Sequence, residues 1–262
     1  MIDHEKILFD KDSSIPLYSQ VENWMRSRII TGEWPPGYKL PPEVELAEKL
    51  NISRGTLRQA ISNLVSEKMI EQSQGKGTFV GKSIFEQSWA YKLVSTYEEL
   101  NWQGIRFETK VLNQCVKEIS ETRILRKLKI DQKKAEVVYL KRLRLIDDTP
   151  VVIHETFFPV DGFRKLLDVD FTQKGMTETL ENELKIDLHY ADHTITAIYT
   201  EKEISDLLDL TYGKPIIYNE HVLYSRSGNV VEFTKGWFRG DRFRLKTRVF
   251  RGEMELKKRN GV

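Results

Sequence analysis

The sequence predicts an α+β protein of two domains, a small helical N-terminal domain ending in a hairpin and a larger C-terminal domain on an antiparallel sheet. Three observations carry this prediction. Apolar residues recur at helical spacing early in the chain. Alternating strand patterns separated by turn residues dominate after Phe107. That second pattern recurs about 80 residues later. We place the domains at residues 14–82 and 92–252, joined by a linker at 83–91.

Composition is that of an ordinary globular protein, with 262 residues, 40% hydrophobic and 31% charged. The sequence contains no apolar run of ~18 residues, and its charged first 14 residues lack the apolar core of a secretory signal. The single cysteine, Cys115, can form neither an intrachain disulfide nor a thiolate zinc site. We expect a cytoplasmic protein with no membrane association, metal or cofactor.

The first domain begins with a predicted helix after Pro16, whose apolar residues recur at helical spacing until Gly32 stops it. Residues 34–37, Trp-Pro-Pro-Gly, indicate a connector. A short second helix follows Pro42, and Asn51 suits the left-handed residue after its end. This order predicts two helices that meet at a turn.

The third predicted helix starts at Ser53, whose hydroxyl can cap its first turn. Its apolar stripe is Leu57, Ile61 and Leu64. The polar side chains of the opposite face are Arg54, Thr56, Arg58, Gln59 and Ser62. Such side chains can bind phosphates and base edges, since arginine reads guanine and glutamine can pair with adenine.

A hairpin at residues 69–80 follows, with Gly75, Lys76 and Gly77 at its tip. A polar helix face alone is commonly just solvated, and a glycine-lysine-glycine turn is commonly just a turn. Together, a short helix, a turn, a polar helix and a glycine-tipped hairpin predict a winged helix-turn-helix, whose second helix enters the major groove of DNA.

Charge places the DNA-facing surface within this domain. Residues 1–82 are neutral overall, with 11 basic and 11 acidic residues. From Asn51 to Lys82, however, five basic residues stand against Glu67 and Glu71. Any interaction with DNA therefore depends on where the basic side chains lie.

Residues 40–81 resemble the DNA-binding head of the GntR family of regulators over nearly its whole length. The resemblance implies that Ser53, Arg54, Thr56 and Arg58 contact operator DNA, with Gly75 and Lys76 at the wing; Gln59 joins this set on its position alone. Two positions depart from the family pattern. Pro42 stands where a capping serine is usual, and Val44 where an arginine often touches DNA, which leaves the preferred operator open.

The second domain is predicted to use one unit twice. After a strand at residues 111–116, a helix at 120–128 and a hairpin at 137–158 make the first copy. Ile204 and Leu208 match Ile124 and Leu128 in the second copy. Twin units around one sheet commonly leave a cleft where small ligands bind.

Arg142 and Arg144 are two residues apart on one predicted strand, so their side chains share a face. They could form a clamp for a carboxylate or phosphate, or salt bridges on a wetted face. His154 could contact a ligand or be a structural hydrogen-bonding residue. The later basic run from Arg239 to Arg251 could bind nucleic acid, but pairing of its arginines with Asp241 and other neighbours explains it better.

Residues 92–250 resemble the UTRA sensor domain, which has a chorismate-lyase-like fold, as in histidine-utilisation repressors. The resemblance implies an effector pocket lined by Arg142, Arg144 and Glu232, to which Ser95 contributes. His154 stands where the family often has glutamate, and Met176, Thr177 and Glu178 replace a Ser-Leu-Tyr run that helps bind sugar phosphates. These departures argue against an ordinary amino-sugar phosphate as effector.

The function predicted from these features is a sequence-specific DNA-binding transcription regulator, a repressor acting as a homodimer. A small anionic metabolite, such as a sugar phosphate, would modulate its binding to operator DNA. Two alternatives stay open: a lyase-like enzyme with an appended DNA-binding head, and an architectural DNA binder without an effector. The enzyme alternative lacks a nucleophile elbow, a metal-ligand cluster and a phosphate-binding glycine loop, so we assign no catalytic residues.

Overall fold

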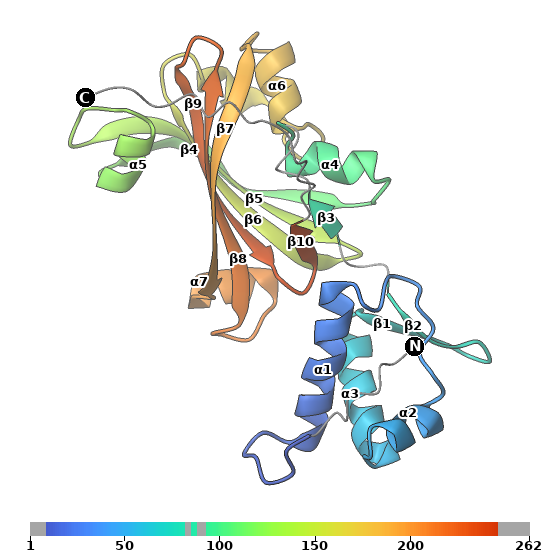
Figure 1. The fold of residues 1–262 in the computed structure, drawn as a ribbon. Coiled ribbons are helices and arrows are strands. Elements are labelled where there is room, and N and C mark those ends of the chain that lie inside the picture. The colour runs from blue at the N-terminus through green and yellow to red at the C-terminus, as the bar shows by residue number, and fades with distance from the viewer. Residues whose placement is uncertain (1–8, 82–84, 88–92, 246–262) are drawn as a thin grey trace, which may run out of the picture.

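The computed structural model describes residues 9–81, 85–87 and 93–245. The chain folds into a helical N-terminal domain and a C-terminal domain built on a six-stranded sheet (Figure 1). The predicted α+β class, with an antiparallel sheet in the second domain, is confirmed. Within the described residues, no helix combines the length and apolarity needed to cross a membrane.

The N-terminal domain contains three helices and a hairpin, in the order predicted. Its elements are α1 (Leu17–Thr31), α2 (Glu43–Lys49), α3 (Arg54–Ser66), β1 (Ile70–Ser73) and β2 (Gly77–Val80). Gly32 ends α1 in the left-handed conformation with its N–H donating to the Ile29 carbonyl, and Asn51 takes a φ of 52° in the turn between α2 and α3. One apolar cluster from all three helices, β1 and β2 forms the core.

A small parallel sheet of two strands lies between the two domains (Figure 1). β3 (Phe85–Gln87) pairs with β10 (Phe243–Leu245) near the other end of the sequence. The segment 83–91, predicted as a linker, therefore contributes a strand to this sheet, and its remaining residues lie outside the described part, as does the basic tail after Leu245.

The C-terminal sheet has the strand order β4-β5-β6-β9-β8-β7, with every neighbouring pair antiparallel. The strands are β4 (Glu108–Ile119), β5 (Ala135–Ile146), β6 (Thr149–Pro159), β7 (Leu188–Tyr199), β8 (Pro215–Ser225) and β9 (Val230–Arg239). Within each half, strands that follow one another in the chain are neighbours in the sheet, and β6 pairs with β9 in the centre.

The predicted repeat accounts for this order. The first half is β4, α5 (Thr122–Lys127), β5 and β6; the second is β7, α7 (Lys202–Leu208), β8 and β9. Glu155 lies opposite Lys235 where β6 pairs with β9. Because these two residues occupy equivalent positions in the repeat, the halves are related by a pseudo-twofold axis at that pair. Helix α5 is shorter than the helix predicted at 120–128, and β4 is longer than the strand predicted at 111–116.

The two faces of the sheet are covered by different helices. α5 and α7 pack on one face, in clusters with Tyr139 and Leu143 of β5. The other face carries α4 (Thr96–Trp102), α6 (Met176–Asn182) and the 3₁₀ helix η1 (Arg164–Asp168). These three short helices and β7 were not expected from the sequence. The cavity described below lies on the face that carries the three helices.

The basic run near the end of the described chain is used in internal contacts. Arg239 forms a two-point ion pair with Asp241, with distances of 3.0 and 2.7 Å, which confirms the predicted pairing. Arg242 donates to the Glu67 carbonyl of the N-terminal domain. Arg244 donates to the Ile29 and Ile30 carbonyls, each at 2.9 Å. Arg242 and Arg244 therefore hold the two domains together.

Candidate functional site

The third helix presents its polar face as the sequence predicted. Ser53 Oγ accepts a hydrogen bond from the Thr56 backbone N–H at 3.0 Å and so caps α3. Leu57, Ile61 and Leu64 are buried against the domain core. Arg54 is exposed on the outer face of the same helix. The helix is thus anchored from behind and leaves its cationic side accessible.

A carboxylate positions the second arginine of this face. Arg58 donates to Glu43 Oε2 from both Nε and Nη2, at 3.2 and 3.1 Å, yet its side chain stays 65% exposed. Gln59 is exposed and donates to Asn63 Oδ1 at 3.1 Å. Pro42 precedes α2 without a side-chain cap, and Val44 is exposed on that helix.

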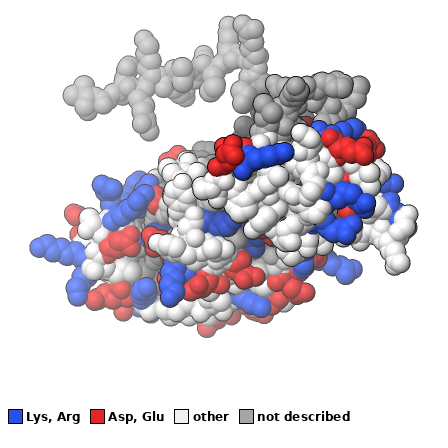
Figure 2. All heavy atoms as spheres, turned by 90° about the horizontal axis from the view of Figure 1, so that it is seen from below, with Lys and Arg blue, Asp and Glu red and all other residues white. Residues whose placement is uncertain are grey.

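The hairpin tip has the backbone that its glycines predict. Gly75 and Gly77 take φ values of 74° and 120°, a region that other residues rarely adopt. Lys76 between them is exposed. Seen from the side on which the N-terminal domain lies, basic and acidic side chains are interspersed on the surface (Figure 2). DNA binding therefore depends on local placement of the basic groups.

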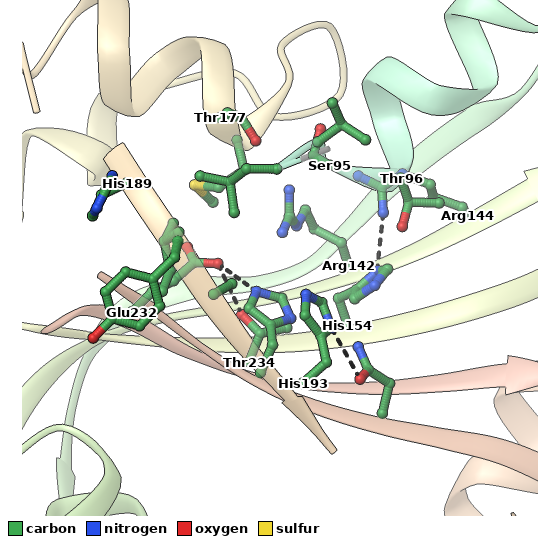
Figure 3. A pocket seen from close by; sticks show the side chains of 18 residues that line it. Ser95, Thr96, Arg142, Arg144, His154, Thr177, His189, His193, Glu232 and Thr234 are labelled. Atoms are coloured by element: carbon green, nitrogen blue, oxygen red, sulfur yellow. Dashed lines mark hydrogen bonds and ion pairs between the residues drawn. The ribbon is translucent and has the colours of Figure 1, made fainter. Parts of the chain in front are cut away.

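A cavity of about 280 Å³ lies in the second domain, on the face of the sheet that carries α4 and α6. All five residues predicted to bind an effector line it, and these are Ser95, Arg142, Arg144, His154 and Glu232 (Figure 3). They come from α4's N-terminal end, β5, β6 and β9. The antiparallel pairing of these strands brings together residues distant in sequence.

The two arginines are buried at the floor of this cavity, with 4% of Arg142 and 2% of Arg144 exposed. Burial lowers the pKa of Arg142 to about 10, opposed by the negative charge of Glu232. Burial and the neighbouring Arg142 lower the pKa of Arg144. Arg142 Nε and Nη1 and Arg144 Nε have no hydrogen-bond acceptor among the described residues. The wetted-face alternative is therefore wrong for this pair.

His154 lies beside Arg144 and is held neutral. Its Nδ1 is 3.0 Å from Arg144 Nη1. Since a guanidinium can only donate, Nδ1 is the acceptor and the ring proton belongs on Nε2. Burial and the charges of both arginines lower the pKa of His154. Its ring packs edge-on against Phe238 at 5.2 Å between centroids.

The opposite side of the cavity offers hydrogen-bond acceptors. Glu232 Oε1 is 2.9 Å from His221 Nε2. Glu232 Oε2 and His221 Nδ1 are buried and have no partner among the described residues. His193 lies 5.0 Å from His221 between ring centroids and 3.2 Å from Asn219 Oδ1. Burial and the nearby His221 lower the pKa of His193 to about 4.

Several lining residues were missed by sequence reasoning. They include His189, His193, Asn219, His221 and Thr234. No local motif marks them. His189 and His193 alternate on one face of β7, which was not expected as a strand, and Asn219 and His221 alternate on one face of β8. Of the three residues that replace the Ser-Leu-Tyr run, Met176 and Thr177 line the cavity, whereas Glu178 is exposed.

The described residues contain no group of three or more His, Cys, Asp or Glu side chains placed to hold a metal ion. The described lining of the cavity offers paired guanidiniums, imidazoles and the Glu232 carboxylate, with the hydroxyls of Ser95, Thr96 and Thr234 nearby. This set can bind an anion and donate and accept hydrogen bonds.

Comparison with known families decides the classification. Residues 17–80 match the model of the gntR family of bacterial regulatory proteins, and residues 103–244 match the UTRA domain. The chain belongs to the GntR family, with a UTRA domain. It is thus a DNA-binding transcription regulator, and the enzyme alternative is set aside because the matching families and relatives are regulators.

Relatives of this GntR regulator cover nearly the whole chain. It is 29% identical to the transcriptional repressor NagR of Bacillus subtilis over 89% of this chain and 95% of that one. It is 28% identical to the histidine utilization repressor of Pseudomonas aeruginosa over 77% of this chain and 79% of that one. The crystal structure of PhnF from Mycobacterium smegmatis shares the fold, with a TM-score of 0.61 at 22% identity over 88% of this chain and all of that one.

Proposed function

We propose that this protein is an effector-controlled transcriptional repressor. Its N-terminal domain binds one half of a near-palindromic operator through Ser53, Arg54, Thr56, Arg58 and Gln59, with Gly75 and Lys76 at the wing. Two copies bind both half-sites. A small anionic metabolite binds the cavity of the second domain and weakens operator binding. Repression rather than activation follows the relatives, whose names include NagR and the histidine utilization repressor.

The observation that carries the effector proposal is the set of unpartnered buried atoms in the cavity. Arg142 and Arg144 provide two cations and unused N–H donors, while Glu232 is the one carboxylate among the described residues that line the cavity. Burying charge without compensation is costly. An anion would offset that cost, because it can accept two parallel hydrogen bonds from one guanidinium.

The acceptor side of the cavity narrows the ligand further. Glu232 Oε2 and His221 Nδ1 lack donors among the described residues. A matching ligand therefore carries its anionic group at one end and hydroxyl or amine donors at the other. A phosphorylated sugar fits this description. His154, neutral where the family often has a carboxylate, leaves more positive charge beside Arg144 than the usual pattern does.

Control of DNA binding requires that the effector favour one arrangement of the two N-terminal domains. A ligand shifts such an equilibrium by its difference in affinity between the arrangements. The Arg242 and Arg244 contacts to the N-terminal domain give the sheet domain a direct connection to α1 and to the residue that follows α3.

Operator binding is tested by mobility shift with DNA from upstream of the protein's own gene, at several salt concentrations. We expect sequence-selective binding that Arg54→Ala weakens by about 1–3 kcal/mol. Arg164→Ala, on the exposed 3₁₀ helix η1, is the matched control and should bind as wild type. Equal affinity for operator and scrambled DNA would contradict the proposal.

Effector binding is tested by thermal shift and calorimetry with hexose 6-phosphates, hexosamine 6-phosphates, small carboxylates, inorganic phosphate and the unphosphorylated sugars. We expect a phosphorylated sugar to stabilise the protein and to release operator DNA, and Arg142→Gln to abolish both effects. Release by a carboxylate alone would change the ligand class. No response to any anion would favour an architectural DNA binder.

A further inference from the structure

The backbone conformation of α3 does not require the glycine at position 55. Gly55 is the second residue of the helix and is exposed. It has the ordinary backbone of a helix, without a positive φ. Glycine is less favourable than alanine in a helix because it loses more conformational freedom on folding. The choice of glycine therefore lowers the stability of α3 without a conformational need.

Packing among the described residues does not require a glycine there either. A Cβ at Gly55 would lie 3.7 Å from Ser53 Oγ, which is an ordinary van der Waals contact. Gly236 is different, since a Cβ there would lie 2.7 Å from a ring carbon of Phe238. Within the described part of the chain, the space for a side chain at Gly55 is thus present and is left empty.

Gly55 lies on the middle line of the polar face of α3. Residues three, four and seven positions further along share its side of the helix. These residues are Arg58, Gln59 and Ser62, and all three are exposed. The apolar stripe lies on the opposite side. Gly55 is therefore a gap in the row of polar side chains that the proposed function directs toward DNA.

The side chains next to this gap are held by contacts within the chain. Ser53 Oγ accepts from the Thr56 backbone N–H at 3.0 Å and lies 2.9 Å from Thr56 Oγ1. Arg58 donates twice to Glu43 Oε2, at 3.1 and 3.2 Å. A surface that approaches this turn of α3 therefore meets bare backbone at Gly55.

We propose that Gly55 is a specificity-determining residue for operator DNA, at which the backbone of α3 contacts the edge of a base pair on the floor of the major groove. Glycine allows this approach because no Cβ stands between the helix backbone and the neighbouring surface. The inference rests on the proposed function, which places the polar face of α3 in the groove, and it names the point of closest approach.

The place of Gly55 in the first turn favours a base edge over a phosphate. The N-terminal residues of a helix in the major groove are those that contact base edges. A helix with its side chains is roughly as wide as the groove, so its depth is sensitive to a single group on the middle line. A methyl group at Gly55 would hold the helix away from the base pairs. Hydrogen bonds from Arg58 and Gln59 to base edges would then become longer and weaker.

The test compares the full chain with Gly55→Ala and Gly55→Leu in mobility shifts on operator DNA and on a scrambled duplex of the same length. We expect Gly55→Ala to lose roughly tenfold or more in affinity for the operator, and Gly55→Leu to lose more. Affinity of Gly55→Ala for scrambled DNA should change by less than about threefold, because non-specific binding depends on phosphate contacts. The melting temperature of Gly55→Ala should equal or exceed that of wild type, because alanine favours the helix.

The matched control is Gly240→Ala in the second domain, which adds the same methyl group where its Cβ would lie 3.9 Å from the Pro215 carbonyl oxygen. It should bind the operator as wild type. Operator binding by Gly55→Ala that equals or exceeds wild type would overturn the inference. Equal losses on operator and scrambled DNA would also overturn it, because they would place a phosphate at Gly55. A wild-type protein without preference for the operator would instead overturn the proposed function.

Discussion

At the scale of single residues, the cavity is defined by charges that the fold has removed from water. Arg142 and Arg144 project from one face of β5, two residues apart, and both are almost fully buried. Buried charges are normally paired. Here the one carboxylate lining the cavity is shared with His221, so the site keeps an excess of positive charge. That excess is the physical basis for expecting an anion.

Gly236 makes room for this arrangement. It pairs with His154 on β6 and Asn219 on β8, beneath the cavity. A Cβ at Gly236 would lie 2.7 Å from Phe238 Cε2 and 3.3 Å from His154 Cδ2. A side chain here would therefore push the His154 ring out of place.

We predict that Gly236→Ala lowers stability by about 1–3 kcal/mol through overpacking and weakens effector binding. Chemical denaturation and calorimetry with the effector measure the two effects. Gly240→Ala is the control, because its Cβ would lie 3.9 Å from the Pro215 carbonyl oxygen, an ordinary van der Waals contact. Wild-type stability and affinity in Gly236→Ala would show that the floor of the cavity can adjust.

His193 makes the stability of the second domain depend on pH. Burial and His221 lower its pKa to about 4 in the folded protein, whereas the unfolded chain protonates near pH 6.5. The unfolded state therefore binds more protons between these values, and the free energy of unfolding decreases as the pH falls through that window. His154 acts in the same direction, since burial and the two arginines lower its pKa as well.

We predict that the ligand-free protein melts at a lower temperature at pH 5.5 than at pH 7.5. The contribution of His193 is on the order of 1 kcal/mol at pH 5.5. His193→Asn should reduce the pH dependence, while His189→Asn, at an exposed position on the same strand, should preserve it. An identical pH profile for wild type and His193→Asn would refute this account.

At the scale of elements, α3 has two features that determine its position, a cap at its first turn and an apolar stripe that packs in the domain core. Ser53 caps the first turn of α3. Leu57, Ile61 and Leu64 are buried on the side of the helix opposite its polar face. Both features follow from spacing along the chain, because a helix places every third or fourth residue on one face. The short helices α4 and α6 have seven residues each, too few for a clear periodic pattern, and their positions depend on packing against the sheet.

We predict that Ser53→Ala destabilises the N-terminal domain by about 1 kcal/mol and weakens operator binding, because the first turn of α3 loses its cap. Thermal unfolding and mobility shift measure these effects. Ser66→Ala at the other end of α3 is the control, since Ser66 bonds a carbonyl within the last turn. Equal losses in both variants would mean that the cap makes no special contribution.

At the scale of the whole molecule, the two domains are joined by more than the chain. Arg244 binds the carbonyls at the end of α1, and Arg242 binds the carbonyl of Glu67, directly after α3. Lys68 donates to the Asp147 carbonyl of the second domain. The end of the sheet domain thus fixes the orientation of α1 and α3.

We predict that Arg242→Ala combined with Arg244→Ala uncouples the two activities. The double variant should still bind operator DNA and effector separately. The factor by which the effector reduces its affinity for operator DNA should be roughly fivefold smaller than in wild type. Titrations of DNA with and without effector measure this factor, with Arg226→Ala on the exposed β8–β9 turn as control. An unchanged factor would place the coupling elsewhere.

The sequence by itself determined the class of the protein, the N-terminal fold, the capped polar helix and the twofold repeat of the sheet domain, because these features depend on periodicity and on residues near one another in the chain. It also singled out five of the residues that line the cavity: Arg142 and Arg144 by their spacing, Ser95 and Glu232 through resemblance to a family, and His154 as a departure from that family. Only the tertiary contacts decided that the two arginines are buried, which histidines lie near them, and that β7 is the last strand of the sheet. These features depend on strand order and on which helices cover each face, which are set by contacts between residues far apart in sequence.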